Sequence, residues 1–217
     1  MVVVVLFSAI PARAQYTSGA LQTEIRNQCL TQEELDRMKA LKALKRASTF
    51  EEVPTFNPDY LLGTWKLNWV ASDAPWGAGG ENTGTVTFKY VENCYYEGLL
   101  QGTGPGGKYT VKIQVMYHQL SKHLTWIETD SRGFTVVRDG DIAGMGGQLT
   151  HRWEALPFTY KGKLIRMTGT LFTASPDRAL QNIYMSVDGV SQRLGNPLLE
   201  RDLTAPPPKK DVTAPPK

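Results

Sequence analysis

The chain has 217 residues, of which 41% are hydrophobic and 21% are charged, and its formal net charge is +3. This length fits one domain with extensions, or two small domains at most, and five Trp and nine Tyr supply apolar surface for a core. Basic and acidic residues are interspersed along the chain, which argues against a nucleic-acid-binding surface.

Residues 1–14 are predicted to be a signal peptide. A short apolar run is followed by Ala12-Arg13-Ala14, a spacing of small residues typical of a signal-peptidase site, so Gln15 would begin the mature chain. No basic residue precedes the apolar run, which we interpret as a start codon assigned too late; the alternative is a buried N-terminal strand. No apolar run is long enough to span a bilayer. We therefore expect an exported protein, periplasmic or extracellular, without a transmembrane segment.

Residues 15–58 are predicted to form one or two short α-helices and a linker. Apolar residues recur every fourth position from Leu21 to Cys29, and Thr31 with Glu34 forms a capping-box pattern. We expect these helices to pack on the following domain or to cover one end of it. The alternative is a helix that binds a partner or a membrane surface.

The two cysteines, Cys29 and Cys94, are compatible with one disulfide in an exported protein. The bridge would close a long loop, which the chain-entropy model values at about 4 kcal/mol. It would also tie the helical extension to the domain that follows. Two free buried thiols are the alternative.

The hydrophobic period changes to two in residues 59–203, and the first strand contains Trp65, Leu67 and Trp69 on one face. Short connections rich in turn residues separate the predicted strands, and no helix-length segment interrupts them. The pattern therefore predicts a mainly β domain, an antiparallel up-and-down meander that closes into a barrel because closure removes exposed edges. Ten strands are predicted, at residues 61–70, 82–90, 92–101, 108–119, 122–130, 133–139, 148–155, 162–173, 180–188 and 191–202.

Residues 204–217 form a tail rich in proline and lysine. The sequence Thr204-Ala205-Pro206-Pro207 recurs as Thr213-Ala214-Pro215-Pro216. Proline at this density favours extended chain, so we predict a disordered, solvated tail. Binding of the tail in a partner's groove is the alternative.

The sequence Leu61-Leu62-Gly63-Thr64-Trp65, followed by a glycine-rich loop and uninterrupted hairpins, resembles the lipocalin-like barrels of the calycin group. A family of uncharacterised bacterial secreted domains has a similar meander. The second lipocalin motif, Thr-Asp-Tyr, is absent, and about ten strands is nearer to nitrobindin-like barrels than to the lipocalin eight. The resemblance implies that Trp65 plugs one end of the barrel and that an arginine near the last strand, Arg193 or Arg201, stacks on it.

Our leading hypothesis is a non-enzymatic barrel that binds a small apolar or amphipathic molecule in its lumen, which ten strands leave incompletely filled. Trp76 lies in the long loop of residues 71–81, and in barrels of this type such a loop often folds over the open mouth. Trp76 is therefore either a lid residue or a residue packed on the rim. The candidate ligand-binding residues are Trp65, Trp76, Trp126, Trp153 and Tyr117.

Haem binding, with peroxide or nitrogen-oxide chemistry, is the second hypothesis, because nitrobindin-like barrels hold haem through a histidine. His151 lies on an apolar face and is the candidate ligand, although a hydrogen-bonded core residue has the same pattern. His118 and His123 face each other across a predicted hairpin without a third ligand, so no metal site is expected.

Other cofactors are not expected, and no catalytic constellation is visible. Strand carboxylates such as Glu128 are expected to face solvent. A structural or interaction module of the cell envelope is the third hypothesis, and a hydrolase or isomerase in the lumen is a fourth.

Overall fold

The computed structural model describes residues 58–91, 95–118, 123–145 and 148–205. A 3₁₀ helix, η1 (Pro58–Leu61), precedes twelve strands in this part of the chain. The strands are β1 (Gly63–Ala71), β2 (Gly80–Val91), β3 (Tyr95–Gly104), β4 (Gly107–His118), β5 (His123–Asp130), β6 (Phe134–Met145), β7 (Gln148–Ala155), β8 (Phe158–Tyr160), β9 (Lys163–Ser175), β10 (Arg178–Val187), β11 (Val190–Gly195) and β12 (Leu198–Arg201).

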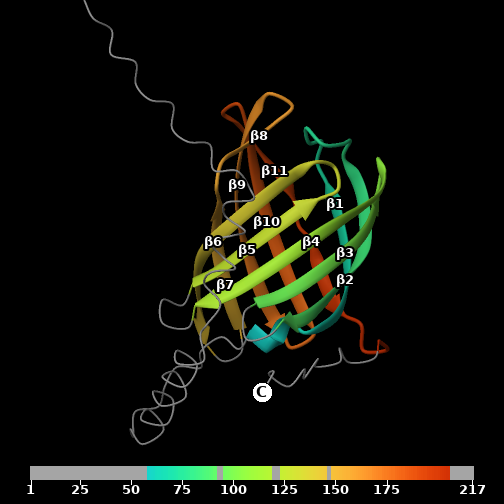
Figure 1. Ribbon diagram of the computed structural model, residues 1–217, viewed down its shortest axis with the longest axis vertical. Helices are drawn as coiled ribbons and strands as arrows, with labels where there is room; N and C mark the ends of the chain where they lie inside the picture. Colours follow the sequence, from blue (N-terminus) through green and yellow to red (C-terminus); the bar gives the residue numbers. More distant parts are fainter. Residues whose placement is uncertain (1–57, 92–94, 119–122, 146–147, 206–217) are drawn as a thin grey trace, which may run out of the picture.

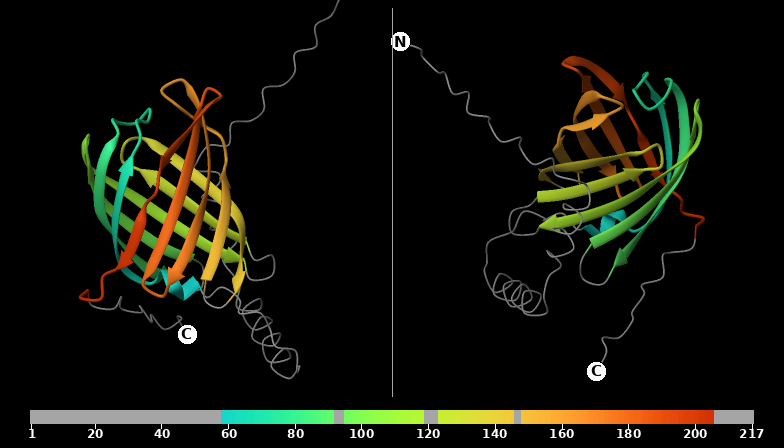
Figure 2. Two further views of the ribbon diagram at one scale, coloured as in Figure 1. Left: turned by 180° about the vertical axis from the view of Figure 1, so that it is seen from behind. Right: turned by 45° about the horizontal axis from the view of Figure 1, so that its top comes forward.

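The strands close into an antiparallel barrel (Figures 1 and 2). Strands β1 to β7 pair in chain order, β7 pairs with β9, and β9 pairs with β10. Strands β11 and β12 each pair with both β10 and β1, so together they occupy one strand position in the barrel. Strand β8 pairs with β9 alone, and the barrel therefore closes with ten strand positions. The predicted mainly β, closed antiparallel barrel of ten strands is confirmed.

Two strands were predicted with wrong bounds, and a third strand was missed. The segment 191–202 is not continuous, because it breaks at Asn196-Pro197, where proline has no N–H for the ladder and its carbonyl accepts from Gln181 N at 2.8 Å. Strand β6 continues to Met145 instead of ending at residue 139, with Ile142 buried inside. The three-residue strand β8, which pairs with β9 alone, was not predicted.

Several predictions concern residues that the structure does not describe. The α-helices before residue 58 belong to this group, as do Cys29 and Cys94 and the tail from residue 206 onward. The described part of the chain contains no helix that is both long enough and apolar enough to cross a membrane.

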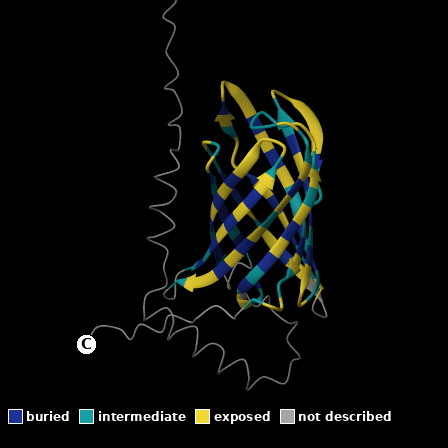
Figure 3. Ribbon diagram, turned by 90° about the vertical axis from the view of Figure 1, so that its right-hand side faces the viewer, coloured by how far each residue is buried: buried dark blue, intermediate teal, exposed yellow. Residues whose placement is uncertain are grey.

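Burial alternates along the strands, as the period of two predicts (Figure 3). On β4, Tyr109, Val111, Ile113 and Val115 are buried, and the intervening Thr110 and Lys112 are exposed. The buried set faces the lumen. A glycine on β3 makes room for the largest of these side chains, because a Cβ at Gly102 would lie 2.5 Å from the Tyr109 ring.

One end of the barrel is plugged by Trp65, whose side chain is only 2% exposed. Its indole Nε1 donates to the Leu61 carbonyl at 2.9 Å, and the Arg201 guanidinium lies 4.1 Å from its ring centroid. Arg193, the other candidate, is exposed and donates to Asn182 instead. The structure thus selects Arg201 as the arginine that stacks on the tryptophan.

The local backbone conformation explains why glycine stands two residues before Trp65. Gly63 has a φ of +112°, a conformation that side-chain-bearing residues avoid, and a Cβ there would lie 3.0 Å from Arg201 Nη1. The same guanidinium donates to the carbonyls of Tyr60 and Leu62. Glycine therefore lets the arginine reach the backbone of η1 and hold the plug in place.

Candidate functional site

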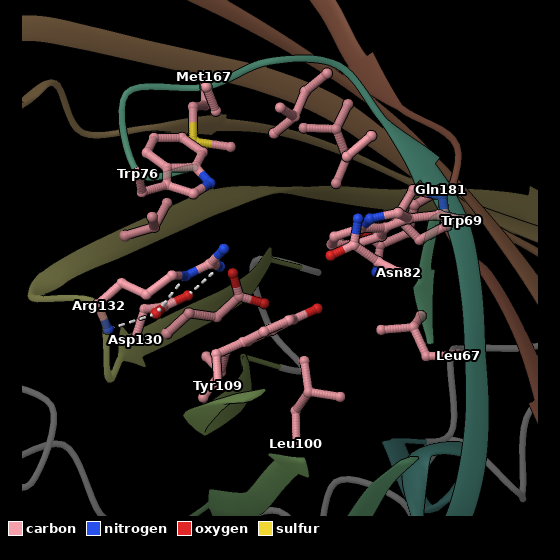
Figure 4. Close-up of a pocket in the computed structure, with 18 of the residues that line it drawn as sticks. Leu67, Trp69, Trp76, Asn82, Leu100, Tyr109, Asp130, Arg132, Met167 and Gln181 are labelled. Carbon is pink, nitrogen blue, oxygen red and sulfur yellow. Dashed lines mark hydrogen bonds and ion pairs between the residues drawn. The ribbon is translucent and has the colours of Figure 1, made fainter. Parts of the chain in front are cut away.

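A cavity of about 120 Å³, counted as space open to the centres of water molecules, lies in the lumen between the plug and the β1–β2 loop (Figure 4). This is several times the ~10–15 Å³ that a single water molecule needs. Its walls are mostly apolar and aromatic, with contributions such as Leu67, Leu100 and Met167, and only a few polar side chains reach it. A concave, mainly apolar lumen of this kind is the usual form of a small-molecule site.

The structure brings two of the five candidate ligand-binding residues to this cavity, Trp76 and Trp126. Trp65 belongs to the plug, and Tyr117 packs against the core on the plugged side. Trp153 is buried beneath Arg138, whose guanidinium carbon lies 4.7 Å from its ring centroid. None of these last three side chains lines the cavity.

The β1–β2 loop carries Trp76 over the cavity. The loop is folded by two hydrogen bonds between the backbones of Ala74 and Gly77, at 2.9 and 3.0 Å. The Trp76 ring stacks on Phe134 with centroids 4.6 Å apart and meets the edge of Tyr160 at 6.3 Å. Trp76 therefore lines the cavity and packs on aromatic side chains of the rim at the same time.

The first buried ion pair of the site joins Arg132 and Asp130 at the end of β5. Asp130 accepts from Arg132 Nε at 2.9 Å and from Nη2 at 2.6 Å, a bidentate arrangement, and also from the Arg132 backbone N–H at 2.8 Å. The turn that brings Arg132 back to Asp130 ends at Gly133, whose φ is +97°. The Arg132 guanidinium then covers the Tyr109 ring at 4.2 Å from the centroid.

The second ion pair lies deeper and joins Arg138 to Glu128. Arg138 is 5% exposed, its Nη2 donates to Glu128 Oε1, and its Nη1 donates to Gln181 Oε1 at 3.3 Å. Its guanidinium also contacts the faces of Trp126 and Trp153. Burial lowers the pKa of Arg138, and the adjacent Glu128 carboxylate opposes that shift. The expectation that Glu128 faces solvent is wrong.

Three polar atoms on cavity-lining side chains are buried without a hydrogen-bond partner in the described part of the chain. They are Trp69 Nε1, Tyr109 Oη and Arg138 Nε. Burial raises the pKa of Tyr109, so its hydroxyl stays protonated. In Figure 4 the Tyr109 side chain extends from the side of Arg132 and Asp130 towards Trp69 and Asn82. Such groups are rare in folded proteins and call for a partner.

Sequence reasoning did not single out the two ion pairs. The signal is present in the period of two, because Trp126, Glu128 and Asp130 alternate on one strand and must share a face. The same holds for Val136 and Arg138 on β6. Pairing of Trp126 with Arg138 in the β5–β6 register then places Glu128 beside Arg138, whereas Arg132 reaches Asp130 through the turn that follows β5.

His151, the candidate haem ligand, is 2% exposed and does not line the cavity. Burial, and then the positive charge of Arg138, lowers its pKa from 6.5 to about 4, so it is neutral at pH 7, and its Nε2 has no hydrogen-bond partner among the described residues. Its register partners Ile142 and Leu171 are also buried. The structure therefore places His151 among buried side chains outside the cavity, and haem binding stays a prediction.

His123 lies outside the lumen site. His118 and His123 are register partners on β4 and β5, and His123 Nδ1 lies 3.2 Å from Asp139 Oδ2 on the surface. Within the described ranges, no group of three His, Cys, Asp or Glu side chains is placed to hold a metal ion.

Comparison with known proteins supports the barrel fold and shows no family for this chain. No family model matches the chain, and no curated protein matches it. Among solved structures, Rv2717c from M. tuberculosis is similar over 66% of this chain and 93% of its own, with 15% identity and a TM-score of 0.53. A de novo designed fluorescence-activating β-barrel matches over 66% of this chain and 95% of its own, with 19% identity and a TM-score of 0.39. The first likeness supports the barrel fold.

Proposed function

We propose that this protein is an exported binding protein that holds a small amphipathic molecule in the lumen of its barrel. The observation that carries the proposal is the combination of an apolar cavity with buried polar atoms that lack partners. A core that served stability alone would pair or omit such atoms, because each unpaired buried group costs about 1–3 kcal/mol. A bound molecule that completes these hydrogen bonds removes that cost.

The aromatic lining supports the same function. Trp76 covers the cavity from the loop side, and the faces of Trp126 and Phe134 contribute to its walls. Flat aromatic surfaces bury a large apolar area with little loss of side-chain entropy.

Export is proposed because residues 1–14 have the pattern of a signal peptide. N-terminal sequencing of the protein from a periplasmic fraction tests this proposal, and the mature chain is expected to begin at Gln15.

The binding test uses the full-length chain exported to the periplasm of an expression host. Native mass spectrometry of the purified protein is expected to show extra bound mass, and titration with the uncharged dye Nile red is expected to raise and blue-shift its emission. Val111→Phe, which places a larger ring in the lumen, should abolish the dye response. Thr110→Phe, its outward neighbour on the same strand, should preserve it.

A folded Val111→Phe protein, checked by circular dichroism, that binds Nile red as the wild type does would contradict lumen binding. Absence of both bound mass and dye response in the wild type would also contradict it.

A further inference from the structure

The charges that line the cavity are balanced and already paired. Two arginines and two carboxylates reach it, in the pairs Arg132–Asp130 and Arg138–Glu128. An anionic ligand would meet no arginine without its own carboxylate, and a cationic ligand would meet no carboxylate without its own arginine. Moving an ion from water into such a site incurs desolvation without a free counter-charge. The balance therefore selects against charged ligands.

The unpaired polar atoms are mainly donors. Trp69 Nε1 and Arg138 Nε carry hydrogens and cannot accept, whereas the Tyr109 hydroxyl can do either. All three belong to side chains that line the same cavity. A ligand that satisfies them must present acceptor oxygens or nitrogens.

We propose, resting on the lumen-binding function above, that the ligand is uncharged and carries at least one carbonyl-type acceptor beside an apolar body. The acceptor takes the hydrogen bonds that Trp69, Tyr109 and Arg138 leave unmade. The apolar body lies against the aromatic side chains that line the cavity.

Three ligands with the same ring system test this proposal: 2-acetylnaphthalene, 2-ethylnaphthalene and 2-naphthoate. They differ only in having an uncharged acceptor, no acceptor, or a negative charge. In competition with Nile red on the full-length protein, the ketone is expected to bind about tenfold more tightly than either of the others. That ratio corresponds to about 1.4 kcal/mol, roughly the net value of one hydrogen bond.

Three variants separate the roles of charge and of the donors. Trp69→Phe and Tyr109→Phe, each removing one unpaired group, should lower the affinity for the ketone by a larger factor than the affinity for 2-ethylnaphthalene. Glu128→Gln keeps a hydrogen-bond acceptor near Arg138 but removes its counter-charge. This variant should gain affinity for 2-naphthoate by about tenfold or more, because it leaves Arg138 with a free positive charge.

The outcomes distinguish this proposal from the function on which it rests. If the wild type binds 2-naphthoate as tightly as the ketone, or 2-ethylnaphthalene as tightly as the ketone, the uncharged-acceptor proposal is overturned and lumen binding stands. If neither Nile red nor any of the three naphthalenes binds, lumen binding itself fails.

Discussion

The plugged end of the barrel and its lumen use the same pair of residue types with opposite results. At the plugged end, Arg201 lies over Trp65 at 4.1 Å, and the indole N–H of that tryptophan donates to a carbonyl. In the lumen, Arg138 lies over Trp153 at 4.7 Å, but the indole N–H of Trp153 and the Nε of Arg138 have no partner in the described chain. The first arrangement is complete by itself and the second is not.

This difference indicates what each end does. Tyr60 and Tyr96 at the plugged end donate their hydroxyls to backbone carbonyls and to Asp59, whereas Tyr109 in the lumen leaves its hydroxyl buried and unpaired. Full pairing stabilises the fold, and incomplete pairing beside a cavity leaves interactions for a ligand. The predictions below test that contrast, beginning with the largest expected effect.

Removal of the plug should destabilise the protein most. Trp65→Ala is expected to lower the free energy of unfolding by about 3–5 kcal/mol, because it leaves a cavity in a fully packed region. Trp76→Ala, at the half-buried loop over the lumen cavity, should lose only about 1–2 kcal/mol. Urea denaturation measures both values, and equal losses would contradict the division between the plug and the β1–β2 loop.

Acid should destabilise the protein through His151, which is buried and neutral between the two regions. Its pKa is about 4 in the folded state and 6.5 in the unfolded state, so the unfolded state binds the proton first as pH falls. The contribution of neutral His151 to the free energy of unfolding is complete above pH 6.5. It is lost as the pH falls from 6.5 to 4, by up to about 1.4 kcal/mol per pH unit. His151→Met should flatten the pH dependence of the urea midpoint in this window, and an unchanged slope would contradict the assignment.

The two arginines near the last strand should differ in their contribution to stability. Arg201→Ala removes the stacking on Trp65 and the hydrogen bonds to the carbonyls of Tyr60 and Leu62, with an expected loss of about 2 kcal/mol. Arg193→Ala, the matched exposed control, should change the unfolding free energy by less than about 0.5 kcal/mol. Thermal and urea unfolding measure the two losses. A larger loss in Arg193→Ala than in Arg201→Ala would contradict the assignment of Arg201 to the plug.

The smallest effect is the sharpest test of the contrast. Tyr96→Phe removes a hydroxyl that donates to Asp59 Oδ1 at 2.8 Å and should cost about 1 kcal/mol. Tyr109→Phe removes a buried hydroxyl that has no partner, so the ligand-free protein should be equally stable or slightly more stable. A similar loss in both variants, measured by urea denaturation, would show that the lumen hydroxyl is already satisfied.

Part of the lumen site could be predicted from the sequence. Trp126 was predicted to bind the ligand, and the period of two places Glu128 and Asp130 on the same face of its strand. Glu128 was instead expected to face solvent, because charge usually marks an exposed face. Arg132 follows Asp130 in the adjacent turn, so this pair is local in the sequence. Arg138, the partner of Glu128, lies on the neighbouring strand β6, and the register that joins the two strands is not encoded in either strand alone.

The sequence by itself determined the barrel, because alternation along a strand and the residues of a tight turn are local properties. It also located Trp65 at the start of the first strand, next to the glycine that the plug requires. Only the tertiary structure chose Arg201 over Arg193, enclosed His151 in the core and left Trp69, Tyr109 and Arg138 with unpaired atoms around one cavity. These outcomes depend on the register between neighbouring strands and on the closure of the last strands against the first, which are properties of the whole ring.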